Sequence, residues 1–352
     1  MELIHYMRYA LTLAKKGKGT TSPNPMVGAV VVKNRRIVGK GYHKRKGKPH
    51  AEYIAIEDAG SLARGATLFV TLEPCVHFGA TSPCVDTIIK AGIKKVFVAT
   101  IDPNPIVNGK GVKKLLDAGV DVEVGLSEKK AIELNEIYNK FITTGEPFVI
   151  LKVATTLDGR IATETHESKW ITDEVGRRYV HELRSWVDAV LVGINTISTD
   201  DPLLTTRLAK GKNPKRIVLD SDFRIPANAR VLGDGCIIAT ASSQEREINA
   251  EVWRLSNDKT GRVDIKALLK EAGKRSITSI LVEGGRDVYT SFLRNKLVDK
   301  FYIFIGTKIF GENGIPFVGN LGIQSLKNAI NMEYTRVKRI GRNVLITGYP
   351  CF

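Results

Sequence analysis

The sequence predicts an α/β protein built from two consecutive domains. The chain of 352 residues is longer than one ordinary domain, and β-rich runs alternate with helical patterns along it. A turn-rich break at residues 143–147 is followed by a new series of the same alternation. We therefore expect domains of residues 1–145 and 146–352. A hydrophobic content of 43% is sufficient for a core in each.

The first half of the chain has the pattern of a sheet with helices on both faces. Apolar residues recur at helical spacing in residues 2–16. The β-rich runs 27–32 and 36–42 flank an Asn-Arg turn and predict a hairpin. The remaining expected elements are helices at 51–59, 84–91 and 111–118 and strands at 67–72, 94–100 and 121–124.

The second half begins a new α/β unit. Expected strands lie at 148–154, 189–193, 216–220, 235–240, 279–283 and 301–305, and expected helices at 174–185 and 287–294. Gly284 and Gly285 stand between a strand and a helix, where they predict either a phosphate-binding corner or a purely steric turn. No G-x-G-x-x-G follows a strand, so the dinucleotide fingerprint of the Rossmann fold is absent.

The strongest chemical signal lies in the first half. His50 and Glu52 form an H-x-E pattern, Cys75 follows a proline, and Cys84 comes after eight intervening residues. One histidine and two cysteines suit zinc, and three protein ligands leave the fourth position open for a catalytic water. Glu52 is then available as the proton shuttle, as in zinc deaminases. The alternative is two buried thiols, a surface histidine and a glutamate at a helix start.

The spacing of His50 and Glu52 sets a geometric condition. Residues two apart do not share a helix face. Both side chains therefore reach one metal centre only if His50 lies at the very start of the helix, where Pro49 is consistent with a boundary.

Composition limits the cellular setting and the partners. Charged residues interrupt the N-terminal stretch, and no apolar run approaches a membrane span, so we expect neither a signal peptide nor membrane insertion. Four cysteines do not form a disulfide framework, which favours a reducing, cytoplasmic location. The net charge of +16 fits diffuse surface charge, an anionic small substrate or nucleic acid.

Several motifs together resemble one enzyme family. PNPMVGAVVV, GYHKRKGKPHAE, TLEPCVHFGATSPC and IDPNPIVNGKG are similar to the deaminase domain of the bifunctional riboflavin-biosynthesis deaminase–reductase family. LKVATTLDGRIAT, SKWIT, HELRSWVDAVLVGINTISTDDPLLT and LVEGG follow in the order of its reductase domain. The resemblance covers nearly the whole chain. It implies an N-terminal cytidine-deaminase-like three-layer domain and a C-terminal dihydrofolate-reductase-like domain.

The resemblance implies roles for residues of the first half. The residues that would hold Zn²⁺ are His50, Cys75 and Cys84, with Glu52 as general acid and base. The substrate would be a diamino-pyrimidinone carrying a ribosylamino 5′-phosphate, in a pocket lined by Asn24, His43 and His77. A turn-forming role for Asn24 and structural roles for the two histidines are the alternatives. Ala80 stands where the family often has an arginine, so that cation is missing.

The resemblance also implies that the second half reduces the ribosyl group to ribityl with NADPH. Residues that would contact the cofactor are Ala154, Trp170, Thr196, Asp200, Gly284 and Gly285. Residues that would contact the substrate are Lys152, Ser168, Arg184, Leu204, Arg207 and Glu283. Two arginines suit a phosphate because each offers a rigid, permanently charged donor fork. A core position for Trp170 and a helix-surface charge for Arg184 are the alternatives.

Two other functions remain open at this point. The first is a nucleic-acid or nucleotide deaminase, which the positive charge favours and the long cysteine spacing disfavours. The second is a chain whose reductase half has become a non-catalytic binding module. We expect the bifunctional enzyme, a small phosphorylated pyrimidine rather than nucleic acid as its partner, and assembly into a homo-oligomer.

Overall fold

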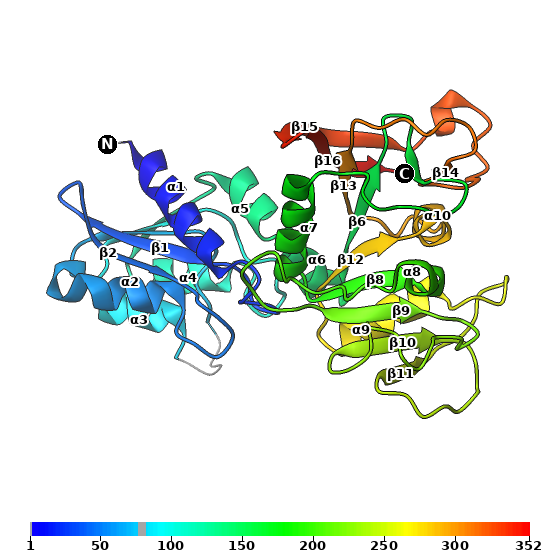
Figure 1. Cartoon of the computed structure of the whole chain (residues 1–352). Coiled ribbons are helices and arrows are strands. Elements are labelled where there is room, and N and C mark those ends of the chain that lie inside the picture. The colour runs from blue at the N-terminus through cyan, green and yellow to red at the C-terminus, as the bar shows by residue number, and fades with distance from the viewer. Residues whose placement is uncertain (1, 77–81) are drawn as a thin grey trace. The chain divides into compact units, whose positions relative to one another are not determined.

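The structure is a computed structural model that describes residues 2–76 and 82–352 (Figure 1). The chain divides into two compact units, Met1–Gly145 and Glu146–Phe352. The blue and cyan part of Figure 1 is the first unit, and the part from green to red is the second. No helix among the described residues is both long enough and apolar enough to cross a membrane.

A five-stranded mixed sheet forms the centre of the first unit. Its strands are, in spatial order, β2 (Arg36–Tyr42), β1 (Gly28–Lys33), β3 (Thr67–Val70), β4 (Lys95–Val98) and β5 (Asp121–Val124). β1 pairs antiparallel with β2 and with β3, whereas β3, β4 and β5 are parallel. β1, β2 and the short loop between them form the predicted hairpin.

Helices cover both faces of this sheet. One face packs against α1 (Leu3–Ala14) and α5 (Glu128–Leu134), and the other against α2 (Ala51–Ala59), α3 (Cys84–Lys90) and α4 (Lys110–Asp117). Alternate residues of β1 enter the two cores, because successive strand side chains point to opposite faces: Ala29 and Val31 lie on one side, Val30 and Val32 on the other. The unit is therefore a three-layer α/β/α domain. Its last element is α6 (Glu136–Thr144).

A nine-stranded sheet forms the centre of the second unit. Its strands are, in spatial order, β11 (Glu251–Arg254), β10 (Cys236–Thr240), β9 (Lys215–Leu219), β8 (Ala189–Gly193), β12 (Ser279–Gly284), β6 (Phe148–Thr155), β13 (Lys300–Ile305), β16 (Asn343–Cys351) and β15 (Asn331–Ile340). The strands from β11 to β13 are parallel, and β16 and β15 continue the sheet antiparallel. β7 (Arg160–Ala162) and β14 (Ile315–Pro316) form a separate small ribbon.

The helices of the second unit connect these strands. They are α7 (Glu174–Trp186), α8 (Ile194–Asp200), α9 (Ile265–Lys274) and α10 (Arg286–Arg294). A large core joins α9 and α10 to apolar side chains of the central strands, including Val149, Leu191 and Ile280. The carboxyl ends of β6, β8, β9 and β12 lie along one edge of the sheet, which is where open parallel sheets bind ligands.

Several elements were not predicted. Helices α5, α6, α8 and α9 and strands β7, β11, β14, β15 and β16 are all additional to the predicted set. β15 is almost wholly exposed and lacks an alternating apolar face, so its pairing with β16 leaves little trace in the sequence. α9 was predictable, since Ile265, Leu268, Leu269 and Ala272 form one buried helical face behind an aspartate cap.

Candidate active sites

The backbone at the start of α2 positions His50. His50 is the N-cap residue, with an extended backbone (φ −74°, ψ 164°), so it precedes the regular helix as its spacing to Glu52 requires. Glycines in β2 let the helix lie close to the sheet. A Cβ on Gly41 would lie 2.4 Å from the carbonyl oxygen of Ala51, so a larger residue there would displace the helix start and His50 with it.

Two other segments bring thiols to the same place. Cys75 follows β3, and Cys84 is the first residue of α3. The backbone N–H of Cys84 donates a hydrogen bond to Cys75 Sγ at 3.4 Å. His50 Nδ1 lies 3.2 Å from Cys84 Sγ and 3.6 Å from Cys75 Sγ. Single ligand atoms of the three residues all lie within 4.8 Å of one another. The structure thus brings together the three residues predicted to bind metal.

The electrostatics of the thiols suit a cation. The hydrogen bond from the Cys84 thiol, together with the one from His50, lowers the pKa of Cys75, although burial opposes this shift. The same hydrogen bond to Cys75, and then burial, raise the pKa of Cys84. Cys75 is therefore the thiol of the pair that ionises more readily, and a bound metal would favour the thiolate form of both. One imidazole and two thiolates form the N/S donor set that zinc prefers.

Glu52 lies beside this cluster inside the protein. Its side chain is 3% exposed, and its Oε2 atom has no hydrogen-bond partner among the described residues. Burial, and then the charge of Cys75, raise the pKa of Glu52 to about 7. A buried carboxylate oxygen without a partner is unfavourable unless a ligand or water binds there, so Glu52 is placed for chemistry rather than for packing.

His43 and Asn24 form the nearest part of a pocket wall. His43 Nδ1 lies 3.2 Å from the carbonyl oxygen of Pro49, and its Nε2 lies 3.2 Å from Asn24 Nδ2. The carbonyl requires a proton on Nδ1, so Nε2 accepts from Asn24. Burial lowers the pKa of His43, which favours this neutral form. The His43 ring also packs edge-on against that of His50 at 5.3 Å. His77 and Ala80 lie outside the described residues.

Sequence reasoning missed Glu73, which lies two residues before Cys75. Its buried carboxylate accepts hydrogen bonds from four backbone N–H groups, which belong to Asp102, Gly109, Gly111 and Val112. These contacts fix the loop before α4 and the start of that helix beside Pro74 and Cys75. The signal available in the sequence was a glutamate directly after a predicted buried strand. A carboxylate that is buried at such a position needs hydrogen-bond or charged partners.

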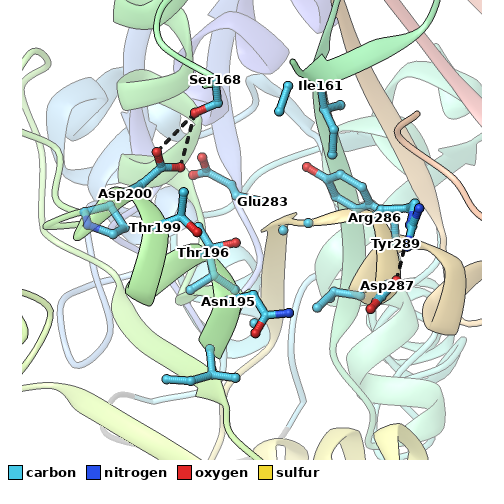
Figure 2. A pocket seen from close by; sticks show the side chains of 18 of the residues that line it. Ile161, Ser168, Asn195, Thr196, Thr199, Asp200, Glu283, Arg286, Asp287 and Tyr289 are labelled. Atoms are coloured by element: carbon cyan, nitrogen blue, oxygen red, sulfur yellow. Dashed lines mark hydrogen bonds and ion pairs between the residues drawn. The ribbon is translucent and has the colours of Figure 1, made fainter. Parts of the chain in front are cut away.

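The second unit contains a cavity of about 1350 Å³ at the carboxyl ends of its parallel strands. All twelve residues predicted to contact cofactor or substrate in this half line it. They are Lys152, Ala154, Ser168, Trp170, Arg184, Thr196, Asp200, Leu204, Arg207, Glu283, Gly284 and Gly285. Figure 2 shows the side chains of Thr196 and Asp200, which come from α8, on one side of Glu283 and those of Arg286 and Tyr289, from α10, on the other.

Glu283 is the central charge of the cavity. It accepts two hydrogen bonds from Arg184, at 2.6 and 2.9 Å, and lies 3.6 Å from Lys152 Nζ. Burial would raise the pKa of Glu283, but the charges of Arg184 and Lys152 outweigh it and lower the pKa to about 2. Burial lowers the pKa of Lys152, and Glu283 opposes that shift. Arg184 also donates to the carbonyl oxygen of Thr205, so three of its five N–H groups are engaged.

A second polar group lies where α8 ends. Ser168 Oγ donates to the carboxylate of Asp200 at 3.1 Å, as drawn in Figure 2. Lys169 Nζ donates to the Asp200 carbonyl oxygen at 3.2 Å. Trp170 is 55% exposed, so it is not a core residue, and the Arg177 guanidinium lies over its ring at 4.3 Å. These contacts join the segment before α7 to the end of α8.

The Gly284-Gly285 corner has both a steric and an electrostatic reason. A Cβ on Gly284 would lie 3.1 Å from Val192 Cα, so close strand packing by itself favours glycine there. Gly285 has φ +84° and is the N-cap of α10, whose first two residues, Arg286 and Asp287, also line the cavity. A phosphate site at this corner stays a prediction.

Known protein families and relatives match most of the chain. A family model described as the RibD C-terminal domain matches residues 147–346, and one for the cytidine and deoxycytidylate deaminase zinc-binding region matches residues 1–100. The riboflavin biosynthesis protein RibD of Aquifex aeolicus is 46% identical over 97% of this chain and 97% of its own. That of Escherichia coli is 37% identical over 97% and 98%. The chain belongs to the RibD family.

Solved RibD structures agree with this assignment. Acinetobacter baumannii RibD superposes with a TM-score of 0.90 at 34% identity, covering 99% of both chains. A Thermotoga maritima protein superposes with a TM-score of 0.88 at 40% identity, covering 99% of this chain and 98% of its own. That protein is described as a diaminohydroxyphosphoribosylaminopyrimidine deaminase and 5-amino-6-(5-phosphoribosylamino)uracil reductase. Membership of the RibD family confirms the predicted fold class and the predicted pairing of a deaminase with a reductase in riboflavin biosynthesis.

The RibD cavity includes polar side chains that sequence reasoning did not select. Tyr289 donates through its hydroxyl to the carbonyl oxygen of Lys152 at 2.6 Å, and Arg286 lies at the start of α10. His181 lies on α7, three positions before Arg184, and also lines the cavity. Helical spacing from Arg184 was the signal that could have found His181, since residues three apart lie on one helix face.

Proposed function

We propose that Met1–Gly145 deaminates a diamino-pyrimidinone carrying a ribosylamino 5′-phosphate, and that Glu146–Phe352 then reduces its ribosyl group to ribityl with NADPH. The observation that carries the proposal is the convergence of three metal-ligating atoms beside a buried carboxylate oxygen without a partner. The description of the Thermotoga maritima relative as a deaminase and a reductase supports the same pair of reactions.

In the deaminase half, His50, Cys75 and Cys84 would hold the zinc ion. Zinc, when bound, lowers the pKa of a coordinated water to about 7 and so supplies hydroxide at neutral pH. Glu52 would take the proton of that water at Oε2 and deliver it to the amino group that leaves as ammonia. Burial of the Glu52 carboxylate keeps bulk water from competing for this proton.

Asn24 and His43 would orient the pyrimidine ring in the deaminase half. Because His43 Nε2 accepts from the Asn24 amide, it fixes the direction of that amide. The amide oxygen of Asn24 is then directed to accept from a ring N–H or amino group of the substrate. His77 is proposed as a third contact from the resemblance of its motif alone.

In the reductase half, NADPH supplies the hydride. Ala154, Trp170, Thr196, Asp200 and the Gly284-Gly285 corner would bind the cofactor. Lys152 Nζ, held near Glu283, would donate a hydrogen bond to the sugar atom that gains a proton on reduction. Arg207 and the two remaining N–H groups of Arg184 would bind the substrate phosphate, with Ser168 and Leu204 completing the wall.

We further propose that the protein acts in the cytoplasm, as a homo-oligomer, on free phosphorylated pyrimidines and not on nucleic acid. All four cysteines are free thiols, which suits a reducing compartment. Most basic side chains that line the reductase cavity lie beside acidic partners, as Arg184 and Lys169 do, which leaves little unpaired positive charge there for a nucleic-acid backbone.

A two-stage assay on the purified full-length protein tests the proposed function. Zinc content is measured first, then ammonia release from the diamino-pyrimidinone ribotide without cofactor, and then the loss of nicotinamide absorbance after NADPH is added. Ammonia release followed by NADPH oxidation is the expected result. Ammonia release without NADPH oxidation would reject the reductase assignment, and neither signal from zinc-loaded protein would redirect the search to nucleic-acid substrates.

A further inference from the structure

Asn24, which the proposed function places against the pyrimidine ring, lies on an irregular segment of the first unit. Pro25 and Met26 belong to neither a helix nor a strand, so no sheet ladder holds their backbone groups. Asn24 N donates to the carbonyl oxygen of Thr21 at 2.9 Å, and Asn24 Nδ2 lies 3.2 Å from His43 Nε2. The position of the Asn24 side chain therefore depends on what holds the backbone that follows it.

A side chain from a distant part of the first unit's sequence holds the backbone of Met26. Met26 N donates to Asn135 Oδ1 at 2.8 Å, and Asn135 Nδ2 donates to the Met26 carbonyl oxygen at 3.0 Å. One amide group thus satisfies both backbone polar groups of one residue, as a neighbouring antiparallel strand would. Asn135 is 2% exposed, so water competes little for the two hydrogen bonds.

Asn135 lies at a helix junction, but its side chain does not cap the helix. It stands between α5 and α6 and is the N-cap residue of α6, a position at which asparagine is favoured because its side chain can accept from the first turn. Here the side chain makes no capping bond and contacts Met26 instead. Buried Ala131 and Tyr138, on the two sides of the junction, anchor it in the unit. The junction therefore serves as a fixed support for Met26.

The short connection from Met26 to Asn24 is stiff. Pro25 lies between them, and its ring fixes its own φ angle and restricts the backbone of the residue before it, which is Asn24. A displacement of Met26 is therefore passed on to Asn24 rather than absorbed in between. A misplacement of about 1 Å is enough to impair an oriented contact with a substrate.

We propose that Asn135 is a positioning residue of the deaminase, which sets the place of Asn24 against the pyrimidine ring through the backbone of Met26. This inference rests on the proposed function, because it takes Asn24 to be a contact of the ring. Its consequence is that loss of the Asn135 amide weakens substrate binding and leaves the residues proposed to bind zinc unchanged.

The test is a double-mutant cycle on the full-length, zinc-loaded protein, with Asn135→Leu, Asn24→Ala and the two combined. Leucine keeps the branched shape of the asparagine side chain but can form neither hydrogen bond to Met26. Steady-state ammonia release from the diamino-pyrimidinone ribotide gives KM and kcat for each protein. Zinc content is measured on the same samples.

Asn135→Leu alone should raise KM by about tenfold and leave kcat within about twofold, because a contact made equally in the ground state and the transition state is weakened. In the Asn24→Ala background the same substitution should change KM by less than about twofold, since the side chain that it displaces is gone. Zinc content should stay at the wild-type level. An equal rise of KM in both backgrounds would overturn the proposal, as would an unchanged KM or a loss of zinc in the single variant.

Asn139→Leu is the matched control. Asn139 lies one helical turn after Asn135 on α6, and its Nδ2 donates to the carbonyl oxygen of Ile132 on α5 at 3.4 Å. Its loss weakens the same helix junction and leaves the bonds to Met26 in place, so KM should not change. A KM raised as much as in Asn135→Leu would overturn the proposal, because the stability of the junction, and not the contact with Met26, would then position Asn24.

Asn135→Asp covers the case of a leucine variant that does not fold. It keeps the size of the side chain and the acceptor for Met26 N but loses the donor to the Met26 carbonyl oxygen, so KM should rise in the same background-dependent way. NADPH oxidation by the second unit should be unchanged in every variant. An Asn24→Ala variant with the KM of the wild type would reject the ring contact of the proposed function, and with it the role of Asn135.

Discussion

At the scale of single residues, one buried carboxylate organises the reductase cavity. Glu283 lies at the end of β12, where it balances two buried cations, Arg184 and Lys152. Removing one partner from such a group leaves an uncompensated charge inside the protein, which costs about 3–5 kcal/mol in comparable buried pairs. The geometry of the cavity and the stability of the second unit therefore depend on the same ion pair.

The stability of the second unit should depend on pH through Glu283. Its pKa of about 2 in the folded protein lies below the ordinary value of 4.5. The ion pair therefore contributes fully above about pH 5, and about 3 kcal/mol of stability is lost as the pH falls toward 2. In Glu283→Gln the unfolding free energy should be lower at pH 7 and should fall less steeply with acid.

Urea unfolding followed by tryptophan fluorescence measures this effect in the second unit alone. The three tryptophans of the chain, Trp170, Trp186 and Trp253, all belong to that unit. Parallel curves of unfolding free energy against pH for wild type and variant would show that Glu283 does not titrate as described.

The second residue-scale prediction concerns Glu52. Glu52→Gln keeps the shape of the side chain but cannot take up a proton, so ammonia release should fall by about 10²–10⁴-fold. Zinc content should stay at the wild-type level, because the proposed ligand atoms belong to His50, Cys75 and Cys84. Ammonia assays and elemental analysis of the same sample measure both. A variant that loses its zinc, or keeps its rate within tenfold, contradicts this role.

At the scale of elements, helix N-termini position the chemistry of both units. His50 caps α2, Cys84 opens α3, and Gly285 caps α10. The backbone changes direction at each of these points, so one residue belongs to the loop and the next to the helix. This change lets His50 and Glu52 approach one centre although they are only two residues apart.

α7 has the most extensive cap in the second unit's cavity wall. The Asp173 carboxylate accepts from Gly176 N in the first turn, from Arg342 N in the turn between β15 and β16, and from Asn343 Nδ2 at the start of β16. Asp173→Ala should lower the unfolding free energy by about 2 kcal/mol, measured by urea and tryptophan fluorescence. It should also raise the KM of the reductase, because α7 carries Arg184.

Asp264→Ala is the matched control for this prediction. Asp264 caps α9 by accepting from Lys266 N, and α9 carries none of the predicted site residues and lines the cavity only with its first residue, Ile265. Its loss should cost about 1 kcal/mol, with the KM unchanged. Equal effects of the two alanine variants on KM would mean that the cap of α7 does not position the cavity wall.

At the scale of the whole molecule, each unit contains its own set of reactive groups. The residues proposed to bind metal and Glu52 lie within Met1–Gly145, and the twelve predicted cavity residues lie within Glu146–Phe352. Each unit also has its own sheet and its own core. The two activities should therefore respond independently to changes confined to one unit.

Removing the metal should separate the two activities. A chelator that strips zinc should abolish ammonia release and leave NADPH oxidation of pre-deaminated substrate within twofold of its original rate, with zinc restoring the first activity. Arg184→Lys should instead reduce NADPH oxidation and leave ammonia release unchanged. Lysine keeps the positive charge of this position but loses the bidentate contact with Glu283. Loss of both activities on chelation would mean that the second unit depends on the metal site.

The metal-ligating residues and the cavity residues were predictable to different degrees. His50, Cys75 and Cys84 follow from residue type and spacing, because few side chains bind zinc and the pattern contains three of them. Arg184 and Glu283 were selected only through a resemblance, since an isolated arginine or glutamate in a sequence has many ordinary uses. Glu73 and His181 were missed, because their importance lies in partners that are distant in sequence or absent.

The sequence by itself determined the two-unit α/β organisation, most central strands and the set of residues predicted to bind zinc, because periodicity and ligand chemistry are local properties of the chain. Tertiary structure alone decided the pairing of β15 with β16, the bidentate contact of Arg184 with Glu283, and the unsatisfied atoms of Glu52 and His181. Those features depend on which distant groups meet and which are left without a partner. Burial makes such pairings matter, since an unpaired polar atom is costly only where water is excluded.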